Sequence, residues 1–267
     1  VVISHGVFWD YPSQPWATLS GPFKREWLRR LHYAVSAADL FVSVDTNMLN
    51  WIRATWPGHE GRQVYIPNFV ETDVFRPSGD ETERSIVLYP RRLDPGRGFN
   101  EAMTAAERLT RKYPRIEFHF VGRGLTEAVE DETRRWAEGN PGCRYYWVPM
   151  HEMPEVYHRA SIVVIPTKSC EGTSLSCLEA MATGKAIIAG RVGGLTDLII
   201  DGYNGCLIDV TPETLADTIE ELLANPEKRR RLGQKARETA ESFSLVKWKE
   251  RWCKALAALW GDPLVGS

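Results

Sequence analysis

The sequence predicts an α/β protein with a complete, doubly wound parallel sheet in residues 78–243 and a partial sheet of the same kind in residues 1–77. Short apolar runs alternate with amphipathic helical segments, which is the pattern of strand–helix–strand units. The alternation breaks at the polar stretch 78–83, as it would at a linker. The 267 residues are 43% hydrophobic, which is enough for a real core.

The first unit shows a β-α-β-α-β pattern of about seventy residues, short of the ~100–200 typical of a domain. The expected elements are a strand at 1–4, a helix at 22–37, a strand at 39–44, a helix that Thr46 or Asn47 caps and that runs through Trp56, and a strand at 63–66. So short a unit cannot cover both faces of its sheet. We therefore expect strands to be missing, and a homo-oligomer or another pairing through the exposed edge.

An unusually aromatic loop, residues 8–16, follows the first strand. It either packs beneath the next helix or forms a pocket for an acceptor. Packing is the more common role of such side chains, and both interpretations stay open.

The second unit starts at Ser85 and alternates strands with helices. The expected strands are 86–90, 116–121, 144–148, 162–166, 186–190 and 206–209. The expected helices are 99–112, 126–138, 153–159, one within 170–185, one that Thr211 caps before Pro212, and one after Pro226. A last amphipathic helix, 244–260, presents Trp248, Trp252, Leu256 and Trp260.

Composition excludes several classes of protein. The net charge of -2 gives no sign of a nucleic-acid partner. No apolar run approaches the ~20 residues that span a bilayer, and no signal peptide is visible. The five cysteines are scattered without a C-x-x-C pair, so we expect neither a disulfide framework nor a zinc site. These features fit a cytoplasmic protein.

The stretch 170–185 is the loop and helix between two apolar strands, so its loop lies at the ligand-binding edge of a parallel sheet. Gly172 allows close backbone approach, and Thr173 or Ser174 can cap the helix, whose first N–H groups then face an anion.

Two carboxylates belong to this stretch. Glu171 lies in the loop and Glu179 about one turn into the helix, so both can face one polyhydroxylated ligand. The spacing is equally consistent with a helix that has solvated glutamates at its start and on its polar face.

This spacing resembles the E-x7-E signature of the retaining glycosyltransferases of family GT4, which have the two-domain GT-B fold. The usual E-G-F-G-L reads here as residues 171–175, with Ser174 in place of a glycine. The resemblance implies that Glu171 holds the transferred sugar, Glu179 holds the ribose, and the amides at Thr173, Ser174 and Leu175 meet the diphosphate.

The same resemblance implies a GT-B-like pair of Rossmann-like domains, an acceptor-side one at 1–77 and a donor-binding one at 78–243. Residues 244–267 would form a terminal helix that crosses back to the first domain. The chain begins at Val1 inside an apolar run, so we expect an N-terminally truncated member of the family.

A second motif, residues 90–98, contains three arginines between a strand and a helix. Such a cluster, taken alone, is usually a solvated surface. It resembles the family's G-R-L-x-x-x-K-G, in which the Arg and Lys hold the diphosphate. Arg92 matches that Arg, Arg97 replaces the Lys with its charge retained, and Arg91 replaces the first Gly.

Three further residues are candidates through the resemblance. The turn at Gly122 would pass beside the nucleotide, although a G-x-G pattern alone is weak. The backbone at Val148 would hold the base. His5, at the end of the first strand, would lie near the transferred sugar, although a lone histidine is equally often structural.

The expected activity is transfer of a sugar from a nucleotide-diphosphate sugar to an acceptor hydroxyl, with no cofactor and no divalent metal. Two alternatives stay open: a sugar-nucleotide-binding module without activity, and a GT-B-fold sugar-nucleotide epimerase. The acceptor, whether a sugar, a glycan or a lipid-linked molecule, cannot be read from the sequence. A lipid-linked acceptor would place the protein at the membrane periphery.

Overall fold

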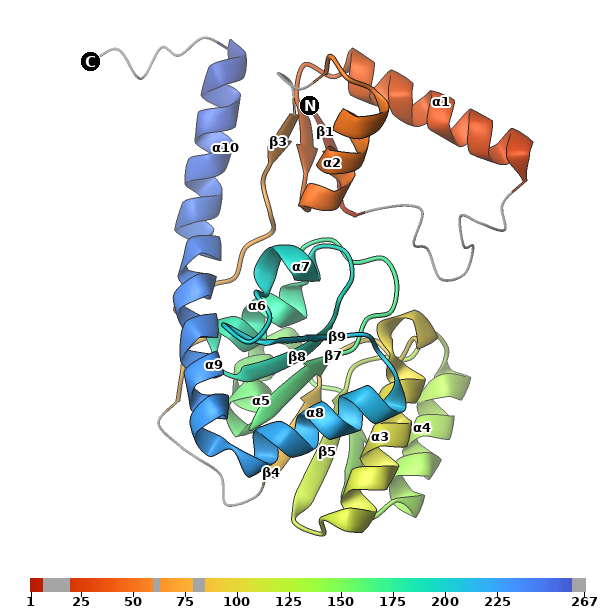
Figure 1. Ribbon diagram of the computed structural model, residues 1–267, viewed down its shortest axis with the longest axis vertical. Helices are drawn as coiled ribbons and strands as arrows, with labels where there is room; N and C mark the ends of the chain where they lie inside the picture. The colour runs from red at the N-terminus through yellow and green to blue at the C-terminus, as the bar shows by residue number, and fades with distance from the viewer. Residues whose placement is uncertain (7–19, 60–62, 79–84, 261–267) are drawn as a thin grey trace.

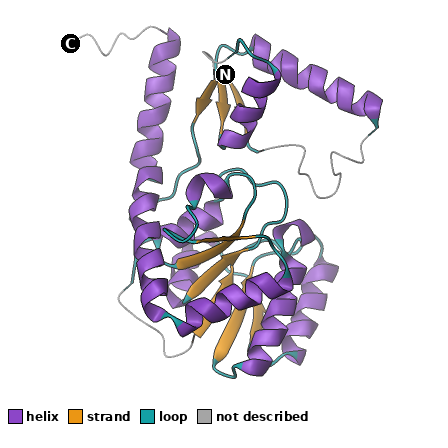
Figure 2. Ribbon diagram, in the orientation of Figure 1, coloured by secondary structure: helices purple, strands orange, loops and turns teal. Residues whose placement is uncertain are grey.

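A computed structural model describes residues 1–6, 20–59, 63–78 and 85–260. A six-stranded sheet with helices on both faces lies below a smaller three-stranded sheet in Figure 1, and helix α10 (Leu245–Trp260) runs beside the small sheet. Figure 2 shows the strands of both sheets in orange and the helices around them in purple. The predicted α/β class with two parallel sheets is confirmed.

The large sheet has the strand order β6-β5-β4-β7-β8-β9, and all its pairs are parallel. The strands are β4 (Ser85–Tyr89), β5 (Ile116–Val121), β6 (Cys143–Tyr146), β7 (Ile162–Ile165), β8 (Ala186–Gly190) and β9 (Cys206–Ile208). The chain moves outward from β4 to β6, returns to the centre at β7, and moves outward the other way to β9. The point between β4 and β7 is therefore the topological switch point, where open parallel sheets bind ligands.

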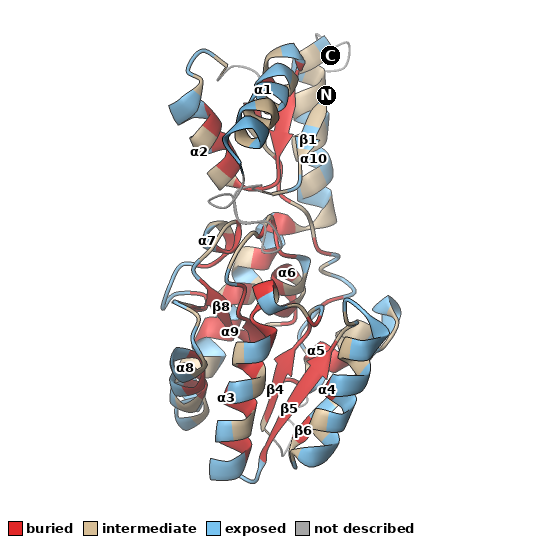
Figure 3. Cartoon of the chain, turned by 90° about the vertical axis from the view of Figure 1, so that its right-hand side faces the viewer, coloured by how far each residue is buried: buried red, intermediate tan, exposed pale blue. Residues whose placement is uncertain are grey.

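Helices cover both faces of this sheet, and its central strands β4, β7 and β8 are therefore almost wholly apolar and buried (Figure 3). One face packs against α3 (Phe99–Lys112), α4 (Glu127–Gly139) and α8 (Pro212–Ala224). The other packs against α5 (Met153–Arg159), α6 (Leu175–Ala182) and α9 (Pro226–Ala240). Successive residues of a strand point to opposite faces of the sheet. In β4, Val87 belongs to the core with α3, and Leu88 belongs to the core with α6.

The small sheet has the order β1-β2-β3, again all parallel. Its strands are β1 (Val2–Ser4), β2 (Phe41–Ser43) and β3 (Gln63–Tyr65), and its own helices are α1 (Gly21–Ala37) and α2 (Thr46–Thr55). These two helices form a core with Phe41 on one face. On the other face, Trp248 and Trp252 of α10 pack against the small sheet's apolar residues Leu40, Val42 and Ile66.

Most predicted elements are present, and helix 99–112, helix 153–159 and strand 116–121 have the predicted bounds. The predicted cap of the helix after β2 is wrong. Asp45 is the N-cap, and its Oδ1 accepts a hydrogen bond from the backbone N–H of Met48 at 3.0 Å. A short helix, α7 (Leu195–Leu198), lies between β8 and β9 where no helix was predicted, because four residues are too few to show a helical period.

The aromatic loop 8–16 and residues 79–83 of the expected linker lie outside the described residues. Within the described ranges, no helix has the length and apolar character needed to cross a membrane.

Candidate active site

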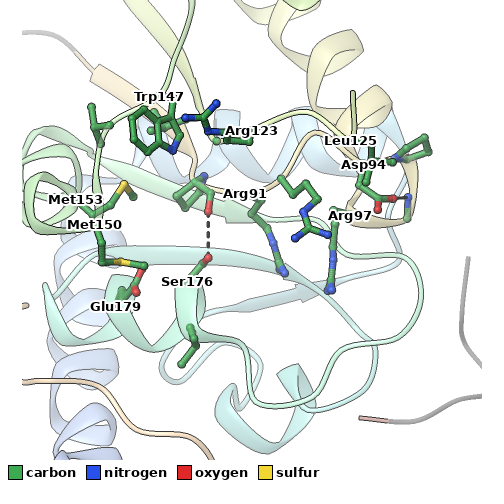
Figure 4. A pocket seen from close by; sticks show the side chains of 18 of the residues that line it. Arg91, Asp94, Arg97, Arg123, Leu125, Trp147, Met150, Met153, Ser176 and Glu179 are labelled. Atoms are coloured by element: carbon green, nitrogen blue, oxygen red, sulfur yellow. Dashed lines mark hydrogen bonds between the residues drawn. The ribbon is translucent and has the colours of Figure 1, made fainter. Parts of the chain in front are cut away.

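A cavity of about 880 Å³ opens at the carboxyl ends of the strands beside the switch point (Figure 4). Its walls come from the loops after β4, β5 and β6 and from α6. The predicted site residues that line it are Arg92, Arg97, Gly122, Val148, Leu175 and Glu179. The predicted residues outside its lining are His5, Glu171, Thr173 and Ser174. Among the described residues, no group of three or more His, Cys, Asp or Glu side chains is placed to hold a metal ion.

Glu171 lies next to this cavity, in the loop after β7, with its side chain only 7% exposed. Its Oε2 accepts hydrogen bonds from Nη2 of Arg91 at 2.7 Å and from the hydroxyl of Thr167 at 3.0 Å. Nη1 of Arg97 also donates to this oxygen. The carboxylate is therefore ion-paired with two arginines that reach it from the loop after β4.

The loop of residues 90–98, called the arginine loop below, is held in shape by its own backbone contacts. Oδ1 of Asp94 accepts from the N–H of Gly96 at 2.7 Å, and Gly98 has a φ of 71°. A Cβ at Gly98 would lie 1.9 Å from the carbonyl oxygen of Pro166, so only glycine fits there. This contact fixes the arginine loop against the end of β7, close to Glu171.

Glu179 lies on α6, one turn after Leu175. The hydroxyl of Tyr157 donates to its Oε2 at 2.8 Å, which favours the charged form. Burial acts in the opposite direction and is the larger effect, so it raises the pKa of Glu179 from 4.5 to about 7. A carboxyl group with such a pKa in a cavity wall is characteristic of a functional site.

The start of α6 faces the arginine loop. Ser174 is its N-cap, but this side chain makes no cap hydrogen bond and its hydroxyl has no partner among the described residues. The first N–H groups of the helix are thus not satisfied by the cap and can meet an anion. The hydroxyl of Ser176 donates to the carbonyl oxygen of Pro90 at 3.0 Å and joins the helix to the arginine loop (Figure 4).

A more apolar wall lies at another side of the cavity, and Figure 4 shows its side chains. The guanidinium carbon of Arg123 lies 4.2 Å from the centroid of the Trp147 ring, which is half exposed. Met150 and Met153 lie in the same wall. A partly exposed flat ring beside flexible thioethers suits a planar heteroaromatic ligand.

The small sheet touches the loop of residues 166–174, called the Glu171 loop below, from outside the cavity. A Cβ at Gly172 would lie 2.5 Å from the carbonyl oxygen of His5, at the end of β1, and the His5 side chain is exposed. The hydroxyl of Thr173 donates to the carbonyl oxygen of Val44 and accepts from the N–H of Asn68 at 3.1 Å. Thr173 thus joins the two sheets.

No role was predicted for Arg91, Arg123 or Trp147, all of which line the cavity. Arg91 belongs to the predicted arginine motif, but it stands where the family pattern has glycine, so the pattern assigns it no role. Trp147 directly precedes the predicted Val148, and its aromatic character next to a strand end was an available signal.

The two parallel sheets match the GT-B fold of solved glycosyltransferases, and the cavity lies at the switch point of the larger sheet. The chain belongs to the family of glycosyl transferases group 1, which matches residues 70–239. The predicted family is confirmed.

Among curated proteins, the chain is similar to alpha-maltose-1-phosphate synthase of Mycolicibacterium smegmatis, with 26% identity over 87% of this chain and 67% of that protein. It is 30% identical to D-inositol 3-phosphate glycosyltransferase of Acidothermus cellulolyticus, over 66% of this chain and 43% of that protein.

Among solved structures, HepE of Anabaena in complex with UDP-glucose has a TM-score of 0.72 and 19% identity, over 83% of this chain and 64% of that one. Sucrose-phosphate synthase of Thermosynechococcus elongatus has a TM-score of 0.74 and 24% identity, over 91% of this chain and 64% of that one. At these identities, the likeness supports the fold alone.

Proposed function

We propose that the chain is the donor-binding part of a retaining glycosyltransferase that moves a sugar from a nucleotide-diphosphate sugar to an acceptor hydroxyl. The observation that carries this proposal is the meeting of the arginine loop and the Glu171 loop at one cavity beside the switch point. The complex of HepE with UDP-glucose supports the choice of donor class.

The cavity offers a position for each part of such a donor. The base would lie against Trp147 and the backbone at Val148, with the ribose on Glu179. The diphosphate would lie between Arg92, Arg97 and the first N–H groups of α6. The sugar would then extend toward Glu171, which orients it.

The same arrangement suits departure of the diphosphate. Negative charge grows on it as its bond to the sugar breaks, and Arg92, Arg97 and the helix N-terminus stabilise that charge. The acceptor hydroxyl attacks from the leaving-group side and gives its proton to the departing diphosphate, so the sugar keeps its configuration. We propose that these groups of the chain suffice, without a divalent metal.

The first test removes the phosphate contacts. Arg92→Ala and Arg97→Ala should each weaken binding of UDP or GDP by roughly tenfold or more, because a hydrogen bond to a charged group contributes ~1.5–3 kcal/mol. Isothermal titration calorimetry measures both variants, with Arg134→Ala as the control because Arg134 forms an exposed ion pair with Asp131 on α4. Wild-type affinity in both loop variants would refute the phosphate site.

A binding module without activity is the second candidate, because the small sheet has three strands in the described part of the chain. A GT-B-fold epimerase is the third. Binding of a donor without transfer or hydrolysis would favour the module, and conversion of the donor without an acceptor would favour the epimerase. A thermal-shift screen of nucleoside diphosphates and their sugars identifies the donor class.

Association through the small sheet is a separate expectation. Its edge strand β1 includes Ile3, which is 43% exposed, and a short parallel edge with apolar side chains invites pairing. We expect dimers or larger species in multi-angle light scattering at micromolar concentration. A monodisperse monomer whose β1 amides are fully protected in hydrogen exchange would contradict this expectation.

A further inference from the structure

Arg91 is the most deeply buried arginine of the site, with its side chain only 8% exposed. Its Nη2 donates to Oε2 of Glu171 at 2.7 Å, and its Nη1 donates to the hydroxyl of Thr167 at 2.8 Å. Thr167 donates in turn to the same carboxylate oxygen at 3.0 Å. These three side chains form a closed hydrogen-bonded ring that leaves Arg91 little freedom to move.

Arg97 has a different position. Its side chain is 32% exposed and lines the cavity, and its Nη1 donates both to Glu171 and to the carbonyl oxygen of Cys170 at 3.2 Å. In the proposed function, the same guanidinium binds the diphosphate of the donor. Glu171 and the diphosphate therefore compete for Arg97.

We propose that Arg91 is a positioning residue that serves as the permanent counter-ion of Glu171 and so releases Arg97 to the diphosphate. This inference rests on the proposed function and concerns the same site. A buried carboxylate that loses its partner is costly, so Arg97 could leave Glu171 only if another cation stayed with it. Arg91 stays, because its second hydrogen bond holds it on Thr167.

Arg91 should therefore raise the affinity for a nucleoside diphosphate that it does not touch. With Arg91→Met, Arg97 becomes the sole arginine on Glu171, and affinity for a nucleoside diphosphate should fall roughly tenfold, as expected for a charged hydrogen bond. With Glu171→Gln, no carboxylate competes for Arg97. In that background, Arg91→Met should therefore change affinity by less than about twofold, within the usual additivity error.

The experiment is a double-mutant cycle at positions 91 and 171, with UDP and GDP titrated calorimetrically into the full chain. Arg91→Lys runs in a second cycle, because it retains the charge and is the better choice if the Met variant is unstable. The loss of nucleotide affinity in Arg91→Lys should be smaller than that in Arg91→Met. It should also vanish in the Glu171→Gln background. Thermal unfolding of each variant confirms that it is folded.

Lys168→Met is the matched control. Lys168 belongs to the same loop as Glu171 but pairs with Glu101, so its removal takes away one positive charge without touching the ring. Its effect should be equal in both Glu171 backgrounds.

Equal losses from Arg91→Met in both Glu171 backgrounds would overturn the inference while leaving the proposed function intact, because Arg91 would then act as a simple charge. If the wild-type chain bound neither nucleotide, the proposed function and this inference would fall together.

Discussion

Glu171→Gln is expected to lower sugar transfer by roughly a hundredfold or more while leaving affinity for free UDP or GDP unreduced. The variant keeps the shape of the side chain but removes the charge that Arg91 and Arg97 pair with. In the proposed function, the sugar then loses a charged hydrogen-bond acceptor, a contact worth ~1.5–3 kcal/mol, and also the group that orients it. Steady-state kinetics and calorimetry on the same preparation measure both quantities.

Glu179→Ala is the contrasting variant in that experiment. Since we propose that Glu179 holds the ribose, its loss should weaken the free nucleotide and the nucleotide sugar alike. Glu171→Ala should instead remove only the additional affinity that the sugar provides. Equal losses for both ligands at Glu171 would overturn its assignment to the sugar. If neither variant changed binding, the two glutamates would have a structural role alone.

The second large effect concerns stability and pH. Glu179→Gln is expected to stabilise the ligand-free chain above pH 7 by up to about 3 kcal/mol relative to wild type, because the folded chain holds this carboxyl with a pKa of about 7 in place of 4.5. Between those two values the unfolded chain has released the proton and the folded chain has not. The stability of the wild type therefore falls as pH rises through this window.

Urea unfolding at pH 5, 6, 7 and 8 tests this expectation. The free energies of unfolding of the wild type and of Glu179→Gln should be most alike near pH 5. The additional stability of Glu179→Gln should then grow until pH 8. Glu132→Gln serves as control, since this glutamate is exposed on α4 and does not line the cavity. A difference between wild type and Glu179→Gln that did not depend on pH would show that Glu179 titrates normally.

The sequence predicted the sheet and the position of its ligand edge because both follow from local patterns. Apolar runs located the strands, and the carboxyl-end rule for parallel sheets placed Glu171 and the arginine loop together. The ion pair between Arg91 and Glu171 could not be predicted in this way. It joins residues 80 positions apart, and it depends on the side-chain rotamers of two loops. The periodicity of the flanking strands does not specify these rotamers.

The N-cap residue of α2 could not be predicted from the local sequence either. Asp45, Thr46 and Asn47 are all good N-cap residues, so the sequence alone does not decide among them. Asp197 accepts from the N–H of Thr46 at 2.8 Å and from its hydroxyl at 2.5 Å. A residue 151 positions away thus engages Thr46, while Asp45 caps the helix.

The packing of α10 has a consequence for the order in which the chain acquires structure during synthesis. The face of the small sheet formed by Leu40, Val42 and Ile66 is covered by side chains of residues 248–259. A ribosome delivers about two hundred residues between these partners, at roughly 5–20 residues per second. This apolar face therefore stays uncovered by its own helix for about ten seconds or longer in the nascent chain.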